Sequence, residues 1–330
     1  MKQLPTLPVF ALCASLLGFG ACPVQAADLL IPGEPVTLSG THGKFDFLSI
    51  DAGKRRLLAA HPGNASLDVI DLDKHALVKS ISTGVAQSAA IDEKGGRYYV
   101  AVSKPPQVVM LDATKLEEVG KVPLAGPADL SAFNMQSGNV YIGHDDGKEL
   151  WVLDPAKQKV TGTVELPSDA PEDLGFDSTF QRLFQALKSS SVITVIDVAE
   201  NKVTASWPTA PAQAPHGMAM MPKEDAFLVA GGNGKLVLMS QKDGHVLSST
   251  DIPARVDQIA YDAEMHRAYC ASGTGKIAVI GVENGVLTTL GEVASSEGCH
   301  SIAVDAATHT VWIVYAKGDA SFARPFSAAK

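Results

Sequence analysis

The chain repeats itself about every 42 residues, and this period constrains the fold more than any other feature of the sequence. Each copy begins with a polar residue, continues through small and apolar residues, and in most copies ends with Asp or Asn. The seven copies are Asp46–Asp51, Gln87–Asp92, Asp129–Asn134, Glu172–Asp177, His216–Met221, Asp257–Asp262 and His300–Asp305, and their last residues fall 41 to 44 positions apart. Self-similarity at such a period indicates a repeat architecture.

Each copy is followed by β-rich runs of sequence. A second run such as YYVAV or VYIGH comes first, then a third such as LDVIDL, then a turn and a fourth. Four short strands per unit are typical of a propeller blade, so we predict an all-β fold, a seven-bladed β-propeller with four antiparallel strands per blade. The seventh unit ends after three strands. We therefore expect Leu29–Ser39 to pair with the blade that contains Trp312, which closes the ring and removes an open edge.

Several of these runs resemble a known family. RYYVAVS, NVYIGHD, RAYCASG and TVWIVYA, with VIDL, VIDV and VLDP after them, resemble the YVTN repeat family of bacterial secreted seven-bladed propellers, which includes YncE-like proteins. The resemblance covers essentially the whole mature chain and implies a fold and an export route. The wider group includes stand-alone proteins and propeller subunits of redox enzymes, so the resemblance does not assign a function.

Residues 1–26 are typical of a secretory signal peptide. An apolar run over residues 7–21 is followed by Val24-Gln25-Ala26, which places small residues before a cleavage site. We predict cleavage near Ala26, a single propeller domain over residues 27–330, and a periplasmic or secreted location in a bacterium. Lipidation of Cys22 is the alternative. The apolar run is short for a membrane span, so no span is expected after cleavage.

Composition narrows the classes of ligand. With 46% hydrophobic and 19% charged residues, the chain is that of a soluble globular protein, and a formal net charge of −9 disfavours electrostatic capture of nucleic acid. The sequence contains no CxxCH motif for covalent haem. We therefore predict neither haem nor a nucleotide as cofactor.

The first residues of the seven copies form the candidate site. In a propeller, the loops that lead into the inner strands open on one face, so these residues should surround the mouth of the central channel. They are Asp46, Gln87, Asp129, Glu172, His216, Asp257 and His300, and all seven are polar. Carboxylates gathered at one opening repel one another, so a cation or a protonated imidazole would stabilise them. The alternative is that each residue only caps its own strand.

Histidines add to this picture. His61 and His144 occupy equivalent places in blades 1 and 3 and are expected to flank the mouth, with solvated surface histidines as the alternative. For a divalent metal ion of unknown identity, the most compact ligand set is Glu172, His216, Asp257 and His300.

Three functions remain open for this ring of residues. The first is binding of a small molecule or a metal ion at the mouth. The second is a metal-assisted lactonase or lyase that uses a histidine as general base. The third is a docking scaffold for a periplasmic protein or a subunit of a periplasmic redox system, which would carry a large apolar patch.

Two cysteines remain after signal cleavage. Cys270 lies late in a second strand and Cys299 lies in the loop that leads into the next blade on the same face, so we predict a disulfide in an oxidising compartment. Two buried free thiols are the alternative.

Overall fold

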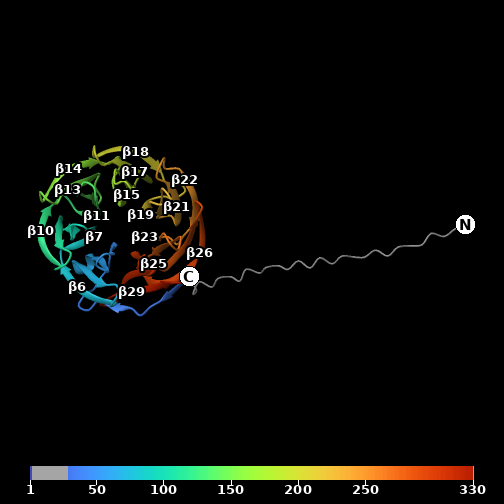
Figure 1. Cartoon of the computed structure of the whole chain (residues 1–330), viewed down its shortest axis with the longest axis horizontal. Coiled ribbons are helices and arrows are strands. Elements are labelled where there is room, and N and C mark those ends of the chain that lie inside the picture. Colours follow the sequence, from blue (N-terminus) through green and yellow to red (C-terminus); the bar gives the residue numbers. More distant parts are fainter. Residues whose placement is uncertain (2–28, 330) are drawn as a thin grey trace.

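The computed structural model describes residue 1 and residues 29–329, and it contains seven small antiparallel sheets arranged in a ring around a central axis (Figure 1). This confirms the predicted seven-bladed propeller. The predicted signal peptide lies almost wholly outside the described residues. Within those residues, no helix has both the length and the apolar character that crossing a membrane requires.

The inner strands line the axis and the second strands pair with them. The inner strands are β3 (Leu48–Asp51), β7 (Val85–Asp92), β11 (Ala128–Phe133), β15 (Pro171–Phe176), β19 (Pro215–Met221), β23 (Val256–Asp262) and β27 (Ile302–Asp305). The second strands are β4 (Arg56–His61), β8 (Arg97–Lys104), β12 (Val140–His144), β16 (Arg182–Leu187), β20 (Ala226–Gly231), β24 (Arg267–Ser272) and β28 (Thr310–Lys317). One short 3₁₀ helix, η2 (Pro62–Asn64), follows β4.

The remaining strands complete each blade toward its outer edge. The third strands are β5 (Ser66–Asp71), β9 (Gln107–Asp112), β13 (Glu149–Asp154), β17 (Val192–Asp197), β21 (Lys235–Ser240), β25 (Thr274–Glu283) and β29 (Ala320–Ala328). The outer strands are β6 (Ala76–Ser82), β10 (Glu117–Pro123), β14 (Lys159–Glu165), β18 (Lys202–Pro208), β22 (Val246–Asp251) and β26 (Val286–Glu297), with β1 (Leu30–Pro32) and β2 (Val36–Thr37) in blade 7.

The burial of the strands explains their sequences. The second and third strands are covered on both faces by neighbouring blades, so runs such as β20 and β21 are almost continuously apolar and buried. The outer strands have one face toward solvent, and β18 accordingly alternates between half-buried and exposed residues along its length. The core is therefore divided into clusters that lie between adjacent blades, as in the cluster shared by blades 5 and 6.

The two ends of the described chain meet in one sheet. β1 and β2 both pair antiparallel with β29, with Leu30 opposite Ala328 and Val36 opposite Ala323. In Figure 1 the blue N-terminal segment accordingly runs beside the red C-terminal strand. Leu30 is fully buried, so the closing strand contributes to the core as well as to the ladder. The predicted closure by Leu29–Ser39 is confirmed.

Each inner strand has a mouth end, where it begins, and a turn end, where it finishes. Residues at the turn end of four blades bond directly to the following blade. Asp51 accepts a hydrogen bond from the Tyr98 hydroxyl at 2.6 Å, and Asp262 lies 2.7 Å from His309 Nδ1. The Asn134 amide donates to the Phe180 carbonyl at 2.8 Å. These contacts join adjacent blades at the edge of the core.

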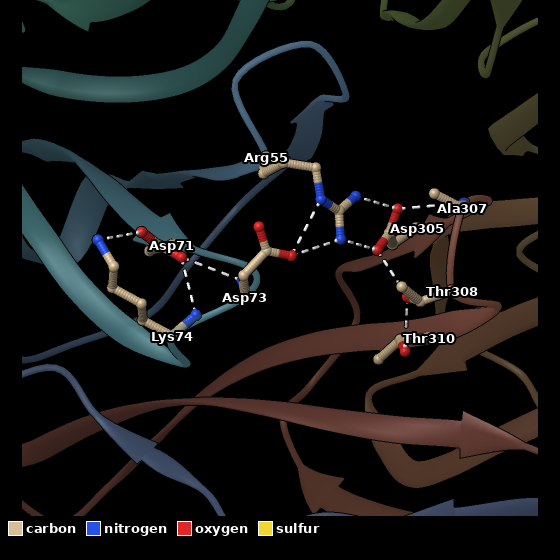
Figure 2. A network of polar contacts seen from close by, with 8 residues as sticks. All are labelled: Arg55, Asp71, Asp73, Lys74, Asp305, Ala307, Thr308 and Thr310. Atoms are coloured by element: carbon tan, nitrogen blue, oxygen red, sulfur yellow. Dashed lines mark hydrogen bonds and ion pairs between the residues drawn. The ribbon is translucent and has the colours of Figure 1, made fainter.

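The strongest of these contacts joins blade 7 to blade 1 (Figure 2). Both terminal nitrogens of Arg55 donate to the Asp305 carboxylate, at 2.7 and 2.6 Å, and the same guanidinium reaches Asp73. Thr308 donates a further hydrogen bond to Asp305 at 2.6 Å. Burial would raise the pKa of Asp305, but the hydrogen bonds from Arg55 and Thr308 outweigh burial and hold that pKa below its ordinary value.

The predicted disulfide between Cys270 and Cys299 is wrong, because both are buried free thiols. Cys270 packs into the cluster between blades 5 and 6, whereas Cys299 packs between blades 6 and 7 beside Tyr269 and Ala271. Side chains alternate between the two faces of a strand, so Cys270 points to the opposite face of blade 6 from its neighbours 269 and 271. Burial raises the pKa of each thiol to about 12.

Candidate functional site

Six of the seven predicted ring residues line one cavity of about 220 Å³ at the mouth of the channel. The same cavity is also lined by two lysines and by apolar side chains from blades 1 and 3. We call this set the mouth cluster, and it comprises Lys44, Phe45, Asp46, Phe47, Asp129, Leu130, Glu172, Lys188, His216, Asp257 and His300. The repeat places one polar residue from each blade at the same height, so side chains far apart in sequence converge here.

Glu172 is the centre of the best-defined contacts. Lys188 Nζ lies 3.1 Å from Glu172 Oε1, and His216 Nε2 lies 3.7 Å from the same oxygen. The other ring nitrogen of His216, Nδ1, donates to the Ala214 carbonyl at 2.9 Å. That hydrogen bond leaves the Nε2 lone pair of the neutral imidazole directed toward the cavity.

The opposite part of the cluster pairs His300 with blade 1. His300 Nε2 lies 3.2 Å from the Phe45 carbonyl and 3.9 Å from Asp257 Oδ2. Gln87 is the ring residue that does not line the cavity. With its amide oriented to donate, the Gln87 nitrogen lies 3.2 Å from Asp46 Oδ2 and supports that carboxylate from behind.

Crowding and burial change the acidity of the cluster. Burial raises the pKa of Asp46 to about 7, with Lys44 opposing and Asp257 and Glu172 reinforcing the shift. Burial, followed by the charges of Asp46 and Glu172, raises the pKa of Asp129 well above its ordinary value. Burial, reinforced by the neighbouring negative charges, therefore disfavours the ionised forms of both carboxyl groups, and Asp46 is only partly ionised near neutral pH.

Glu172 also has a pKa above its ordinary value, because burial outweighs the attraction of His216 and Lys188. Its neighbour Asp173 faces away from the cavity and accepts the backbone N–H of Met218 at 2.8 Å. Burial raises the pKa of Asp173 to about 7. Adjacent acids on one strand therefore differ in use: Glu172 lines the cavity and Asp173 bonds blade 4 to blade 5.

His61 and His144 do not line the mouth cavity. His61 is fully buried, stacked on Phe45, with Nδ1 2.8 Å from the buried Asp68 carboxylate. The His144 ring packs at a tilt against Trp151, with 4.7 Å between ring centroids, and its Nδ1 lies 3.1 Å from Glu149. Asp68 lies on the neighbouring strand of the same blade, and its contact holds the His61 side chain in the interior. The position of His61 in the repeat did not predict this contact.

The repeat pattern predicted a divalent metal ion held by Glu172, His216, Asp257 and His300. The structure brings all four residues to the cavity, but as two separate pairs, Glu172 with His216 and Asp257 with His300. Among the described residues, no three or more His, Cys, Asp or Glu side chains are grouped as metal ligands. The metal set therefore lacks support, and the metal-dependent lactonase alternative lacks it too.

Two cationic residues complete the cluster, and one of them was missed. Lys188 directly follows the second strand of blade 4, close to the place that His61 and His144 occupy in blades 1 and 3, whereas Lys44 was not considered, although it is two residues before Asp46. Phe45 and Phe47 were also missed. They alternate with Lys44 and Asp46 along one loop, and this alternation is the signal that could have identified them.

Solved structures share the fold. A WD40-repeat domain of RRP9 superposes with a TM-score of 0.76 at 10% identity, over 89% of this chain and 99% of that one. A chain of the mitotic checkpoint complex gives 0.77 at 13% identity, over 96% and 98%. A hydrazine synthase chain from Kuenenia stuttgartiensis gives 0.69 at 13% identity, over 84% and 95%. Identities this low support a common propeller architecture and nothing finer.

The fold and the polar channel mouth define a seven-bladed propeller with a candidate ligand site on its axis. Residues 49–250 match the Cytochrome D1 heme domain family, and the chain belongs to that family. This match does not confirm the predicted resemblance to the YVTN repeat family. Comparison with curated protein sequences finds no significant relative.

The family match also overturns the prediction that excluded haem. That prediction rested on the missing CxxCH motif. The motif marks covalent attachment, and haem iron is also held by an axial side chain such as His, Met or Tyr without any covalent link to the macrocycle. Its absence therefore did not exclude haem.

The mouth cluster offers a side chain that could hold haem iron, but its cavity is too small to enclose haem. His216 offers a free Nε2 whose partner nitrogen is fixed by a carbonyl, which is the usual arrangement of a metal-binding imidazole. The cavity of about 220 Å³ is smaller than the roughly 300–1,000 Å³ that encloses a drug-sized ligand, and a tetrapyrrole is no smaller. The mouth cavity is therefore too small to enclose a haem.

Proposed function

We propose that the protein is a ligand-binding propeller whose mouth cluster takes a small organic cation, such as an aliphatic amine or a guanidinium compound. The observation that carries this proposal is the crowding of four carboxylates, Asp46, Asp129, Glu172 and Asp257, around one cavity lined by only two lysines. Above neutral pH, the carboxylates outnumber the ammonium groups two to one.

The lining favours an organic cation over an anion or a neutral compound. Unpaired carboxylates in a confined space are stabilised by a cation that enters among them, which returns their pKa values toward the ordinary range. The half-buried Phe47 adds aromatic surface to the lining, and ring faces attract ammonium and guanidinium groups. A volume of about 220 Å³ suits a compound of a few heavy atoms.

Thermal unfolding at pH 8 with 1,4-diaminobutane tests the proposal, with 1,4-butanediol as the neutral compound of matched shape. The diamine should raise the unfolding temperature saturably and the diol should not. At a ligand concentration 100 times Kd, mass action adds about 2.7 kcal/mol to the free energy of unfolding. At pH 5 the diamine effect should shrink, because the pKa of Asp46, which burial raises to about 7, leaves that group largely protonated, and burial shifts the pKa of Glu172 in the same direction.

Variants assign the effect to the cluster. The double change Glu172→Gln and Asp257→Asn should abolish the diamine shift. Asp251→Asn is the matched control, since Asp251 is an exposed carboxylate paired with Lys235 outside the cavity. Equal shifts with diamine and diol, or a diamine shift that survives the double change, would contradict the proposal.

The family match and the free Nε2 of His216 favour haem as a second candidate ligand. Haem supplies iron-centred redox or ligand-binding chemistry when bound. Because the cavity is too small to enclose it, haem would lie over the mouth, with His216 as the residue that would hold its iron. Titration with haemin, followed by the Soret band, tests this candidate. A stoichiometric spectral shift that is lost in His216→Ala and kept in His309→Ala would support it, and the absence of a shift would contradict it.

We also propose that the protein is exported and that it binds a protein partner in the periplasm. The signal-type sequence of residues 1–26 supports export, and propeller faces commonly bind proteins. Cell fractionation with detection of a chain shortened near Ala26 tests export. Retention of the full-length chain in the cytoplasm would contradict it.

A further inference from the structure

The turn end of blade 5 differs from that of the other blades. In six blades the inner strand ends with Asp or Asn or is directly followed by one, whereas the inner strand of blade 5 ends with Met221, which is fully buried and apolar. Beside Met221, between blades 5 and 6, lies a hollow of about 470 Å³. This volume falls within the roughly 300–1,000 Å³ of sites that bind small molecules. Because His216 is the second residue of β19 and Met221 is its last, the hollow lies on the face opposite the mouth cluster.

The walls of this hollow, which we call the 5–6 hollow, are apolar. Met221, Ala226, Leu238 and Val282 are buried side chains of its lining, and Leu247 lies at its edge with 47% of its surface exposed. An exposed leucine beside buried apolar walls is stabilised when an apolar group covers it.

The rim of the hollow is acidic. Glu224 and Glu283 both line it, and the residues that line it include no lysine or arginine. The Tyr261 hydroxyl of blade 6 donates to Glu224 Oε1 at 3.1 Å and holds that carboxylate at the junction. The apolar walls therefore suit an apolar part of a ligand, and the acidic rim suits a positively charged part of the same ligand.

A second hollow of about 540 Å³ continues the first. The two share His266, Glu283 and Asn284, and the second is also lined by Val286 and Leu290, which are 56% and 36% exposed. An extended ligand could therefore reach from one hollow into the other past Glu283.

We propose that the 5–6 hollow is a second binding site, independent of the mouth cluster, for an amphipathic cation. Its aliphatic or aromatic body packs on Leu238, Leu247 and Val282, and its protonated amine pairs with Glu224 and Glu283. Met221 makes the site possible, because an acid at this position would place a charged group against the apolar walls.

Methyl NMR of methionine-labelled protein tests the proposal with n-octylammonium as the probe and n-octanoate as the compound of matched length and opposite charge. Excess 1,4-diaminobutane is present throughout, so that occupancy of the mouth cluster does not contribute. Met221 lies in the hollow and Met110 lies in blade 2, away from it. Octylammonium should shift the Met221 signal saturably and leave Met110 unchanged, and octanoate should bind at least fivefold more weakly.

Surface variants separate the apolar contact from the charge. Leu247→Lys should weaken octylammonium binding tenfold or more, whereas Val78→Lys, at a residue with the same 47% exposure on blade 1, should not. Glu224→Gln with Glu283→Gln should bring octylammonium and octanoate within twofold of each other. The proposal is overturned if Met221 shows no saturable shift, if the two lysine variants behave alike, or if octanoate binds wild type as tightly as octylammonium.

Discussion

The two ends of the inner strands carry the same kinds of residue and use them differently. At the turn end, Asp305 is 2% exposed and its carboxylate is fully engaged by Arg55 and Thr308. At the mouth end, Asp46 and Asp129 face other carboxylates across a cavity. An acidic residue at a repeat position therefore stabilises the fold where the adjacent blade supplies a hydrogen-bond donor. Where the neighbouring blades supply mainly other carboxylates, the acidic residue is available to bind a ligand.

Opening the ring should cause the largest loss of stability, because the mouth ends and the turn ends of the inner strands both depend on ring closure. A chain that starts at Phe45 lacks β1 and β2, bares the edge of β29 and removes the buried Leu30 and Leu38. Burial of a leucine contributes about 1.5–3 kcal/mol, so we expect a loss of at least about 3 kcal/mol and aggregation. Thermal unfolding and sedimentation measure both. Unchanged melting and solubility would show that β1 and β2 do not close the ring.

Breaking one turn-end pair should have the next largest effect. Arg55→Ala leaves the buried Asp305 carboxylate without its main donor, and we expect a loss of about 2 kcal/mol in urea unfolding. Arg97→Ala is the matched control, because its pair with Asp112 is more exposed and lies within one blade. The control should cost less than about 1 kcal/mol. Similar losses in both variants would refute a special role for the junction of blades 7 and 1.

The two ends should respond to pH with opposite signs. The pKa of Asp46 is raised from 3.8 to about 7, so its contribution to stability is present below pH 4 and is lost as pH rises through 7. The pKa of Asp305 is lowered, so its contribution is present above the ordinary value and is lost as pH falls.

Urea unfolding between about pH 2 and pH 8 measures these contributions, because the Asp305 contribution is lost only below its ordinary pKa of 3.8. Asp46→Asn should flatten the decline in stability by up to about 1.4 kcal/mol per pH unit, the limit for one proton. Asp305→Asn should instead flatten the loss on the acid side. If Asp46→Asn leaves the slope unchanged, the mouth carboxylate is not raised as described.

The smallest effect is expected from the mouth histidine. His216→Ala should change the free energy of unfolding by less than about 0.5 kcal/mol, because its protein contacts are local and partly exposed. His309→Ala, the matched change at a turn end, should cost about 1 kcal/mol, because it deprives the buried Asp262 of a partner. Circular dichroism during thermal unfolding compares the two, and a reversed order would contradict the division between the ends.

The periodicity of the sequence predicted the fold and most of the candidate site. Repeats determine strand count and the height of each residue on the axis, so Glu172, His216 and Asp257 could be placed at one mouth without coordinates. Contacts between strands could not be predicted in the same way. His61 turns inward to Asp68, and Cys270 faces the opposite side of its sheet from Cys299, because these outcomes depend on the pleat and on the partner across the sheet.

The haem prediction failed for a different reason. A motif search detects ligands joined to the chain by covalent bonds, whereas an axial histidine is a single residue with no spacing to recognise. The family match over residues 49–250 is what contradicts that prediction.

The antiparallel pairing of Leu30 with Ala328 also sets the order in which the chain can fold. These residues stand near opposite ends of the described chain, so their contact has almost the largest sequence separation available and a high loop-closure entropy. Each blade joins residues close in sequence and can form early, but the seventh sheet is completed only after β29 has been synthesised and the N-terminal segment has returned to it. Ring closure is therefore a late step, and until then the edge of β29 is exposed to pairing with other chains.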